Sequence, residues 1–254
     1  MSTMPSSIER FSSVIGKLRA WGCITIKAIG RDCGSVSYDY LMYNIRPLDT
    51  TGTWRSDGAR FCESARIMLV ELERVAAEVV AESPVPTGVS FDGGAYPELF
   101  TKVRHRDALS DSVKIFAAMG IEGFLNFYGV VRLGQDIFDE HFERMLIHQK
   151  LSKLLVVCEN VRITKSHPMH KHLTWIAGAR NDLLHPKAKE FQRPIKASDK
   201  NWTAVPGAAQ EAVMRMTQFF LEFERAVLGA DFLFPECEIE ALQQLKARQG
   251  ISTG

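Results

Sequence analysis

An arginine and a histidine in the second half of the chain have the residue types and the spacing for acid–base chemistry. Arg180 is followed directly by Asn181 and, five positions along, by His185. Near neutral pH an imidazole can accept a proton and return it, and a guanidinium can stabilise negative charge that develops on a phosphate group. A proline disfavours the helical conformation of the residue before it, so Pro186 should end a helix at or just before His185. The pattern therefore predicts that the pair lies near the C-terminal mouth of a helix.

The helix that carries this pair is predicted over about Met169 to Leu184. Arg180 falls on its apolar stripe, so the cation should point inward. A buried arginine without a partner would cost several kcal/mol, so either a carboxylate or a bound phosphate must lie nearby. Arg180 and His185 are about 140° apart around the helix axis, so one helix alone does not aim both at one point. The apolar residues of the stripe recur at three- and four-residue spacing: Leu173, Ile176 and Leu183.

Two polar residues on an otherwise apolar helix are the expected partners of the motif. Glu122 and Asn126 lie one turn apart, and polar groups inside a bundle need hydrogen-bond partners. We expect Glu122 to pair with Arg180. A purely structural interpretation stays open for each residue: Arg180 and Glu122 could tie two helices together, and His185 could simply bind the last carbonyls of its helix.

The segment Arg180-Asn181-Asp182-Leu183-Leu184-His185 resembles the signature of the HEPN family, an arginine, a polar residue and a histidine after four to six intervening positions. Ile121 to Asn126 is similar to the first-helix segment of many HEPN-like proteins, and the resemblance covers about Leu109 to Leu228. It implies a helical bundle that acts as a metal-independent endoribonuclease without a cofactor. Many such proteins are toxins or antiviral effectors, and they work as dimers with paired motifs across a two-fold cleft.

The resemblance also implies roles for individual residues. The RNA 2′-hydroxyl would attack its own phosphodiester, while Arg180 stabilises the phosphorane, His185 moves the proton and Asn181 positions the scissile group or His185. The expected partners are RNA, a second copy of the chain and an antitoxin or regulatory protein. Some HEPN toxins carry a tyrosine two residues after the histidine, and here that position is Lys187, which departs from that branch. The strand would be held by basic residues just beyond the motif: Lys187, Lys189 and Arg193. The alternative is a catalytically inert HEPN-like helical module that binds a protein or RNA partner.

Two other arrangements in the same region are interpreted as coincidences. Arg162 and His167 repeat the motif spacing, but a non-polar residue follows the arginine, β-branched residues surround it and Pro168 follows the histidine, so a loop is expected. His167, His170 and His172 do not share one helical face and have no cysteine or carboxylate near them in sequence, so no metal site is predicted.

Composition and charge set the broader limits. The 254 residues are 46% hydrophobic and 24% charged, which is typical of a folded globular protein. Residues 162–200 contain nine Lys and Arg against three Asp and Glu, a net charge of +6, whereas the whole chain carries +1. Positive charge therefore gathers around the motif. It would attract a phosphate backbone, or it could simply belong to a solvated loop. The five cysteines are scattered and should be reduced. With neither a signal sequence nor an apolar stretch long enough for a bilayer, we expect a cytoplasmic protein that does not bind membranes.

Periodicity predicts a mainly α fold, an HEPN-like helical bundle with a smaller N-terminal α+β or irregular segment. Residues 1–95 form a part of unknown role, with a helix over 7–20, a hairpin over 23–45 and a long helix over 59–82 that could join the bundle. The bundle is expected over 96–232, after a linker that ends near Pro97, and 233–254 supply a terminal helix and tail. The helices of the second half are expected at Ser110 or Asp111 to Arg132, Asp136 to Glu159, Met169 to Leu184, Pro206 to Gly229 and Glu238 to Arg248.

Overall fold

All regular secondary structure among the described residues is helical, as predicted. The computed structural model describes residues 45–46, 56–82, 96–184 and 207–250. No strand occurs within those ranges. The α-helices are α2 (Asp57–Glu82), α3 (Pro97–Leu133), α4 (Gln135–His141), α5 (Ile147–Leu154), α6 (Pro168–Leu184), α7 (Gly207–Ala226) and α8 (Glu236–Gln249), with a π-helical turn at Leu155–Glu159 and a 3₁₀ turn at Asp231–Leu233.

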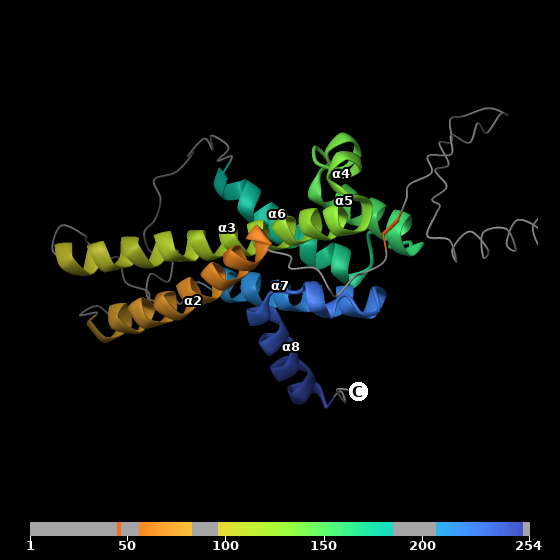
Figure 1. Ribbon diagram of the computed structural model, residues 1–254. Helices are drawn as coiled ribbons and strands as arrows, with labels where there is room; N and C mark the ends of the chain where they lie inside the picture. The colour runs from red at the N-terminus through yellow and green to blue at the C-terminus, as the bar shows by residue number, and fades with distance from the viewer. Residues whose placement is uncertain (1–44, 47–55, 83–95, 185–206, 251–254) are drawn as a thin grey trace, which may run out of the picture.

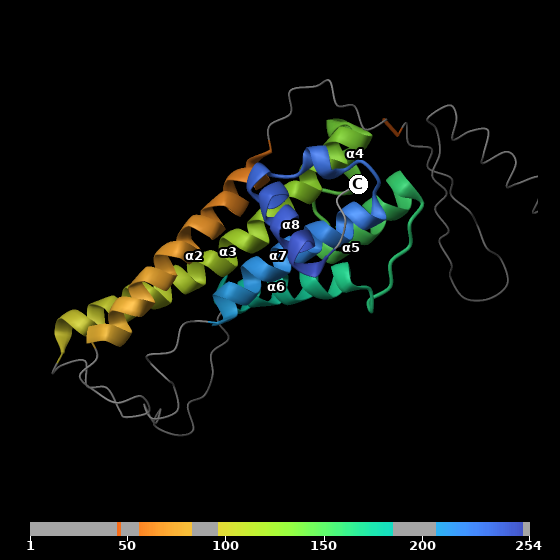
Figure 2. The same cartoon turned by 90° about the horizontal axis from the view of Figure 1, so that it is seen from below.

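Helices α2 and α3 form a long antiparallel pair whose far ends project beyond the rest of the molecule (Figures 1 and 2). The direction follows from two contacts, because Gly58 at the start of α2 lies against Phe124, whereas Lys102 forms an ion pair with Glu82 at its end. A Cβ atom on Gly58 would lie 2.6 Å from the backbone nitrogen of Phe124. The two backbones therefore approach closely because this position carries no side chain.

Helices α6 and α7 pack against the other half of α3, and α8 crosses α7 (Figure 2). The centre of this packing is aromatic, since the ring of Phe124 meets those of Phe220 and Phe223 edge to face at 5.0 Å. Edge-to-face pairs at this separation are favourable beyond the area that they bury. One continuous core joins residues of all seven described α-helices, α2 to α8. The expectation that the helix over 59–82 could join the bundle is thus confirmed.

The first predicted boundary of α3 is wrong. The sequence indicated a start at Ser110 or Asp111, but the helix begins at Pro97. A proline in the first turn of a helix loses no intrahelical hydrogen bond. The additional turns lie in the projecting part, where Leu99, Val103 and Arg106 of α3 are buried and the first two form a small apolar cluster with Val79 of α2. The end at Gly134 is confirmed, because this glycine caps α3 with a positive φ of 85°.

The helix expected from Asp136 to Glu159 is also wrong, because the chain breaks between α4 and α5 and ends in a π-helical turn. The break allows the rings of Phe138 and Phe142 to stack at a centroid distance of 6.2 Å. Neither glycine nor proline occurs between His141 and Ile147, so no local sequence signal marks the change of direction.

The remaining expectations on secondary structure divide into two groups. The helices over 59–82, 169–184 and 238–248 are confirmed to within about two residues, and that expected to reach Gly229 ends at Ala226. The helix over 7–20, nearly all of the hairpin over 23–45 and most of the linker lie outside the described residues. The domain boundaries at 95 and 232 stay predictions.

One described helix, α3, is long and apolar enough to cross a membrane by length and composition alone, contrary to the expectation from the sequence. Half of its most apolar window is buried inside the protein, as in a core helix, so this is weak support for a membrane span.

Candidate functional site

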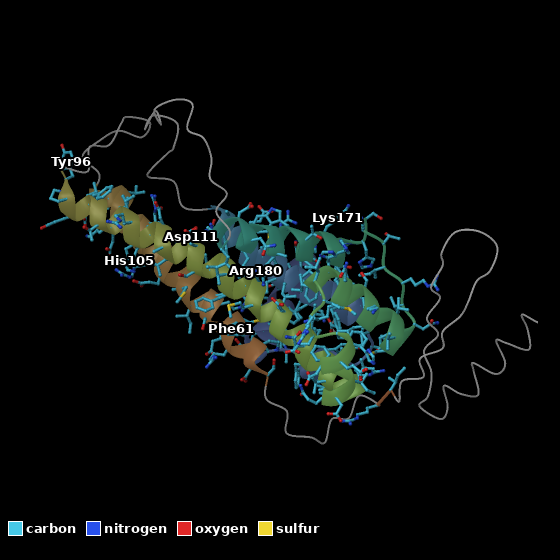
Figure 3. All side chains as sticks on the ribbon, turned by 90° about the horizontal axis from the view of Figure 1, so that it is seen from above. Phe61, Tyr96, His105, Asp111, Lys171 and Arg180 are labelled. Carbon is cyan, nitrogen blue, oxygen red and sulfur yellow. The ribbon has the colours of Figure 1, made fainter. Side chains whose placement is uncertain are left out.

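The last turn of α6 places Arg180 against the middle of α3 (Figure 3). The apolar stripe fixes this orientation, since Leu173 and Ile176 are fully buried while Leu183 is half-buried. The side chain of Arg180 keeps 22% of its surface exposed. The guanidinium is therefore held by the bundle but remains reachable from solvent.

Glu122 pairs with Arg180, as the sequence predicted. Nη1 of Arg180 donates to a carboxylate oxygen of Glu122 at 2.6 Å. Nε and Nη2 both donate to the side-chain oxygen of Asn181, at 3.3 and 3.2 Å. A guanidinium has five N–H donors, so three are used here and two, one on each terminal nitrogen, have no partner among the described residues.

The contact between the side chains of Asn181 and Arg180 was not predicted from the sequence. It was expected to position the scissile group or His185, whereas its oxygen contacts the neighbouring guanidinium. Asn181 itself is exposed at the surface of α6. Together with Glu122 it fixes two sides of Arg180 and leaves part of the terminal nitrogens free for an oxyanion.

Asn126 also finds a partner, and this one was missed from the sequence. Its side-chain oxygen accepts a hydrogen bond from Nζ of Lys150 on α5 at 2.5 Å. Lys150 is 1% exposed, and its ammonium lies 5.4 Å from the centre of the Phe138 ring. Burial lowers the pKa of Lys150, and the nearby charge of Glu122 opposes that shift.

The residues just beyond α6 lie outside the described residues. These are His185, which the motif requires, and the basic residues expected to hold a strand: Lys187, Lys189 and Arg193. The second copy of the motif spacing, by contrast, is described. Arg162 is exposed in the connection before α6 and His167 directly precedes that helix, so the expected loop is confirmed.

Histidines gather on α5 and α6 without forming a metal centre. The rings of His148 and His170 are 5.9 Å apart, and burial, with the charge of His148, lowers the pKa of His170. Burial likewise lowers the pKa of His172, whose Nδ1 is buried and has no hydrogen-bond partner among the described residues. In the part of the chain that the structure describes, no group of three His, Cys, Asp or Glu could hold a metal ion.

The cysteines within the described ranges are free thiols. Burial raises the pKa of Cys62, and it raises those of Cys158 and Cys237 to about 12 and about 11. A thiol with a raised pKa is a poor nucleophile near neutral pH. These three cysteines are therefore weak candidates for chemistry.

The cluster of Glu122, Asn126, Lys150, Arg180 and Asn181 is thus the strongest candidate site, and we call it the α3–α6 polar cluster. It contains two cations and one carboxylate, a net charge of +1, on which a phosphate oxyanion could be held. Comparisons with family models, with curated proteins and with solved structures gave no match.

Proposed function

We propose that this protein is a metal-independent endoribonuclease of the HEPN type, acting in the cytoplasm as a homodimer, in toxin or antiviral defence. The observation that supports it best is the position of Arg180. It lies in the last turn of a helix, partly exposed, with two N–H donors unused among the described residues. A guanidinium presented in this way can bind a phosphodiester through charge-assisted hydrogen bonds.

The reaction proposed for this site is an internal transesterification. The RNA 2′-oxygen attacks the adjacent phosphorus, the bond from phosphorus to the 5′-oxygen breaks, and a 2′,3′-cyclic phosphate and a free 5′-hydroxyl result. His185 takes the 2′-hydroxyl proton as neutral imidazole and, as the imidazolium so formed, returns it to the leaving 5′-oxygen, so protons balance. Arg180 stabilises the negative charge that develops on the phosphorane oxygens.

A second copy of the chain would supply the paired motif. Two motif helices meeting across a two-fold axis would bring the Arg180 and His185 side chains of both copies to one cleft, whereas positions five residues apart on a single helix would be about 140° apart around its axis. Lys187, Lys189 and Arg193 would then hold the RNA strand by its phosphates.

The test is incubation of the purified protein with single-stranded and structured RNA in the presence of a chelator. We expect wild type to yield fragments with 2′,3′-cyclic phosphate ends, and Arg180→Ala and His185→Ala each to lower the rate by about 100-fold or more. The matched control is Arg162→Ala, an exposed arginine of the coincidental second copy, which should cleave like wild type.

The proposal of an endoribonuclease is wrong if wild type and His185→Ala leave the same fraction of RNA intact with all of these substrates. Mass spectrometry of the termini adds a second criterion, since products with 5′-phosphates would require a different mechanism.

The alternative function, an inert helical module that binds a protein or RNA partner, is favoured by one specific observation. Glu122 and Asn181 hold three of the five N–H donors of Arg180, as they would if the arginine only tied α6 to α3. In that case Arg180→Ala should lower thermal stability. Neither wild type nor the variant should cleave RNA. If the protein is a nuclease, wild type should cleave RNA and Arg180→Ala should lose that activity.

A further inference from the structure

A second cation of the α3–α6 polar cluster, Lys150, has no direct carboxylate partner among the described residues. Lys150 donates to Asn126, and within the described residues no carboxylate lies within 4.0 Å of its Nζ. Transfer of an ammonium from water into a protein interior costs several kcal/mol unless an opposite charge or good hydrogen bonds offset it. An amide oxygen is a partial offset, so the position of Lys150 calls for a nearby negative charge.

Glu122 is the acid best placed to supply that charge. It raises the pKa of Lys150 through space, ahead of Glu143, the other acid that acts on this ammonium. Arg180, from α6, is the cation that shares Glu122 with it. The carboxylate of Glu122 therefore acts electrostatically on two cations, and among the described residues it forms a direct ion pair with Arg180.

The two possible positions of this carboxylate are close together. Glu122 and Asn126 are four residues apart on α3, so their Cβ atoms are about 5–6 Å apart on the same face of the helix. Lys150 contacts the side chain of Asn126, one turn along. The side chain of Glu122 is 33% exposed, so it is not enclosed on all sides by the bundle.

A phosphate on Arg180 would change the balance between these positions. It would compete with Glu122 for Nη1, and two anions on one guanidinium repel each other. A second cation close by would stabilise the charge of a carboxylate displaced in this way.

We propose that Glu122 is an internal competitor of phosphate at Arg180, and that Lys150 receives its carboxylate when a phosphate group binds. Lys150 is then a positioning residue that acts through Glu122 and does not touch the ligand. The inference rests on the proposed function only in that Arg180 binds phosphate, and it does not require cleavage.

The experiment is a double-mutant cycle on binding of inorganic phosphate, followed by calorimetry or by phosphorus NMR. Glu122→Gln removes the competitor and should tighten binding by about 5-fold or more. Lys150→Gln keeps a donor for Asn126 but removes the charge, and should weaken binding about 10-fold when Glu122 is present. In the Glu122→Gln background the same change should have less than about a 2-fold effect, and Lys150→Arg should restore binding towards wild type.

A further variant separates this mechanism from a structural role of Lys150. Asn126→Asp places a carboxylate on Lys150 at the position where the amide oxygen now accepts its hydrogen bond. Lys150 would then be occupied, so phosphate binding should weaken although the fold gains an ion pair. That weakening should disappear when Glu122→Gln is added, whereas direct repulsion of phosphate by the new aspartate would persist in both backgrounds.

The outcomes are distinguishable from those of the nuclease test. The inference is overturned if wild type binds no phosphate, if the effects of Glu122→Gln and Lys150→Gln simply add, or if Asn126→Asp weakens binding equally in both backgrounds. RNA cleavage with additive effects leaves the nuclease standing without this mechanism. A non-additive cycle without cleavage leaves the mechanism standing and removes the nuclease.

Discussion

At the scale of single residues, two ion pairs of the protein differ in how much of the fold depends on them. Glu238 is 0% exposed, and its two oxygens accept hydrogen bonds from Nε and Nη2 of Arg66, both at 2.8 Å. Thr217 donates to the same carboxylate at 3.1 Å. This cluster joins α2, α7 and α8, whereas the pair of Glu122 and Arg180 lies at the surface and has donors to spare.

Glu238→Gln should therefore destabilise the protein strongly. The substitution leaves Arg66 largely buried without its charge partner, and breaking a buried pair of this kind costs about 3 kcal/mol. Chemical denaturation followed by circular dichroism measures the change. The control is Glu71→Gln, which breaks an exposed pair with Arg74 and should leave stability nearly unchanged. Equal effects of the two substitutions would contradict this account of the cluster.

His172 should make stability depend on pH. Burial lowers its pKa below the value of the unfolded chain, so the folded state binds the proton less readily than the unfolded state. Stability should then be constant above the unfolded pKa near 6.5 and should fall as the pH drops from there towards the lower folded value. His172→Leu should flatten the free energy of unfolding between about pH 7 and pH 5. A slope identical to that of wild type would show that this histidine does not cause the dependence.

At the scale of secondary-structure elements, the crossing of α2 and α3 depends on a missing side chain. Gly58→Ala would place its Cβ 2.6 Å from the backbone nitrogen of Phe124 and 2.8 Å from a backbone carbon of Gly123. Backbone atoms within a helix cannot easily move aside, so we expect a loss of about 2 kcal/mol in unfolding free energy.

The matched control is Gly178→Ala on α6. A Cβ there would meet nothing within 4 Å, and alanine favours a helix over glycine. Its expected effect is a gain of about 0.5–1 kcal/mol, opposite in sign. Thermal unfolding of the two variants side by side checks both. A loss of stability in Gly178→Ala as large as that in Gly58→Ala would show that helical glycines matter here for another reason.

The elements that could be predicted from the sequence are those whose apolar residues repeat at helical spacing. This is why α6 and α8 were placed to within about two residues, and why Arg180, a cation on an apolar stripe, could be assigned its partner Glu122. The first turns of α3 were missed because they lie in the projecting part and bury few residues.

Lys150 was missed for a different physical reason. A lysine within an amphipathic pattern usually faces solvent, and what buries it comes from elsewhere in the chain: the ring of Phe138 on α4 and the side chain of Asn126 on α3. The break between α4 and α5 that brings Phe138 and Lys150 together has no local signal either. Both the burial of Lys150 and the break between α4 and α5 therefore depend on tertiary packing.

At the scale of the whole molecule, buried contacts are distributed unevenly. The large core joins seven helices around Phe124 and Phe220, whereas Val79, Leu99 and Val103 at the far ends of α2 and α3 form a separate, small cluster. Regions with few buried apolar contacts open more readily than the core. Hydrogen exchange followed by mass spectrometry should show faster exchange for amides of α3 near Val103 than for those near Phe124. Uniform protection along α3 would show that the paired ends are as stable as the bundle.

The length of α3 has one more consequence. Pro97 and Glu122 are 25 residues apart on one uninterrupted helix, a span of about 37 Å at 1.5 Å per residue. A molecule bound near Pro97 is therefore too far away to contact the guanidinium of Arg180. It could influence Arg180 only by tilting α3 as a whole. A dye near Pro97 and a second dye on α8 would report such a tilt as a change in their separation, and an unchanged separation would mean that the tip does not influence the guanidinium in this way.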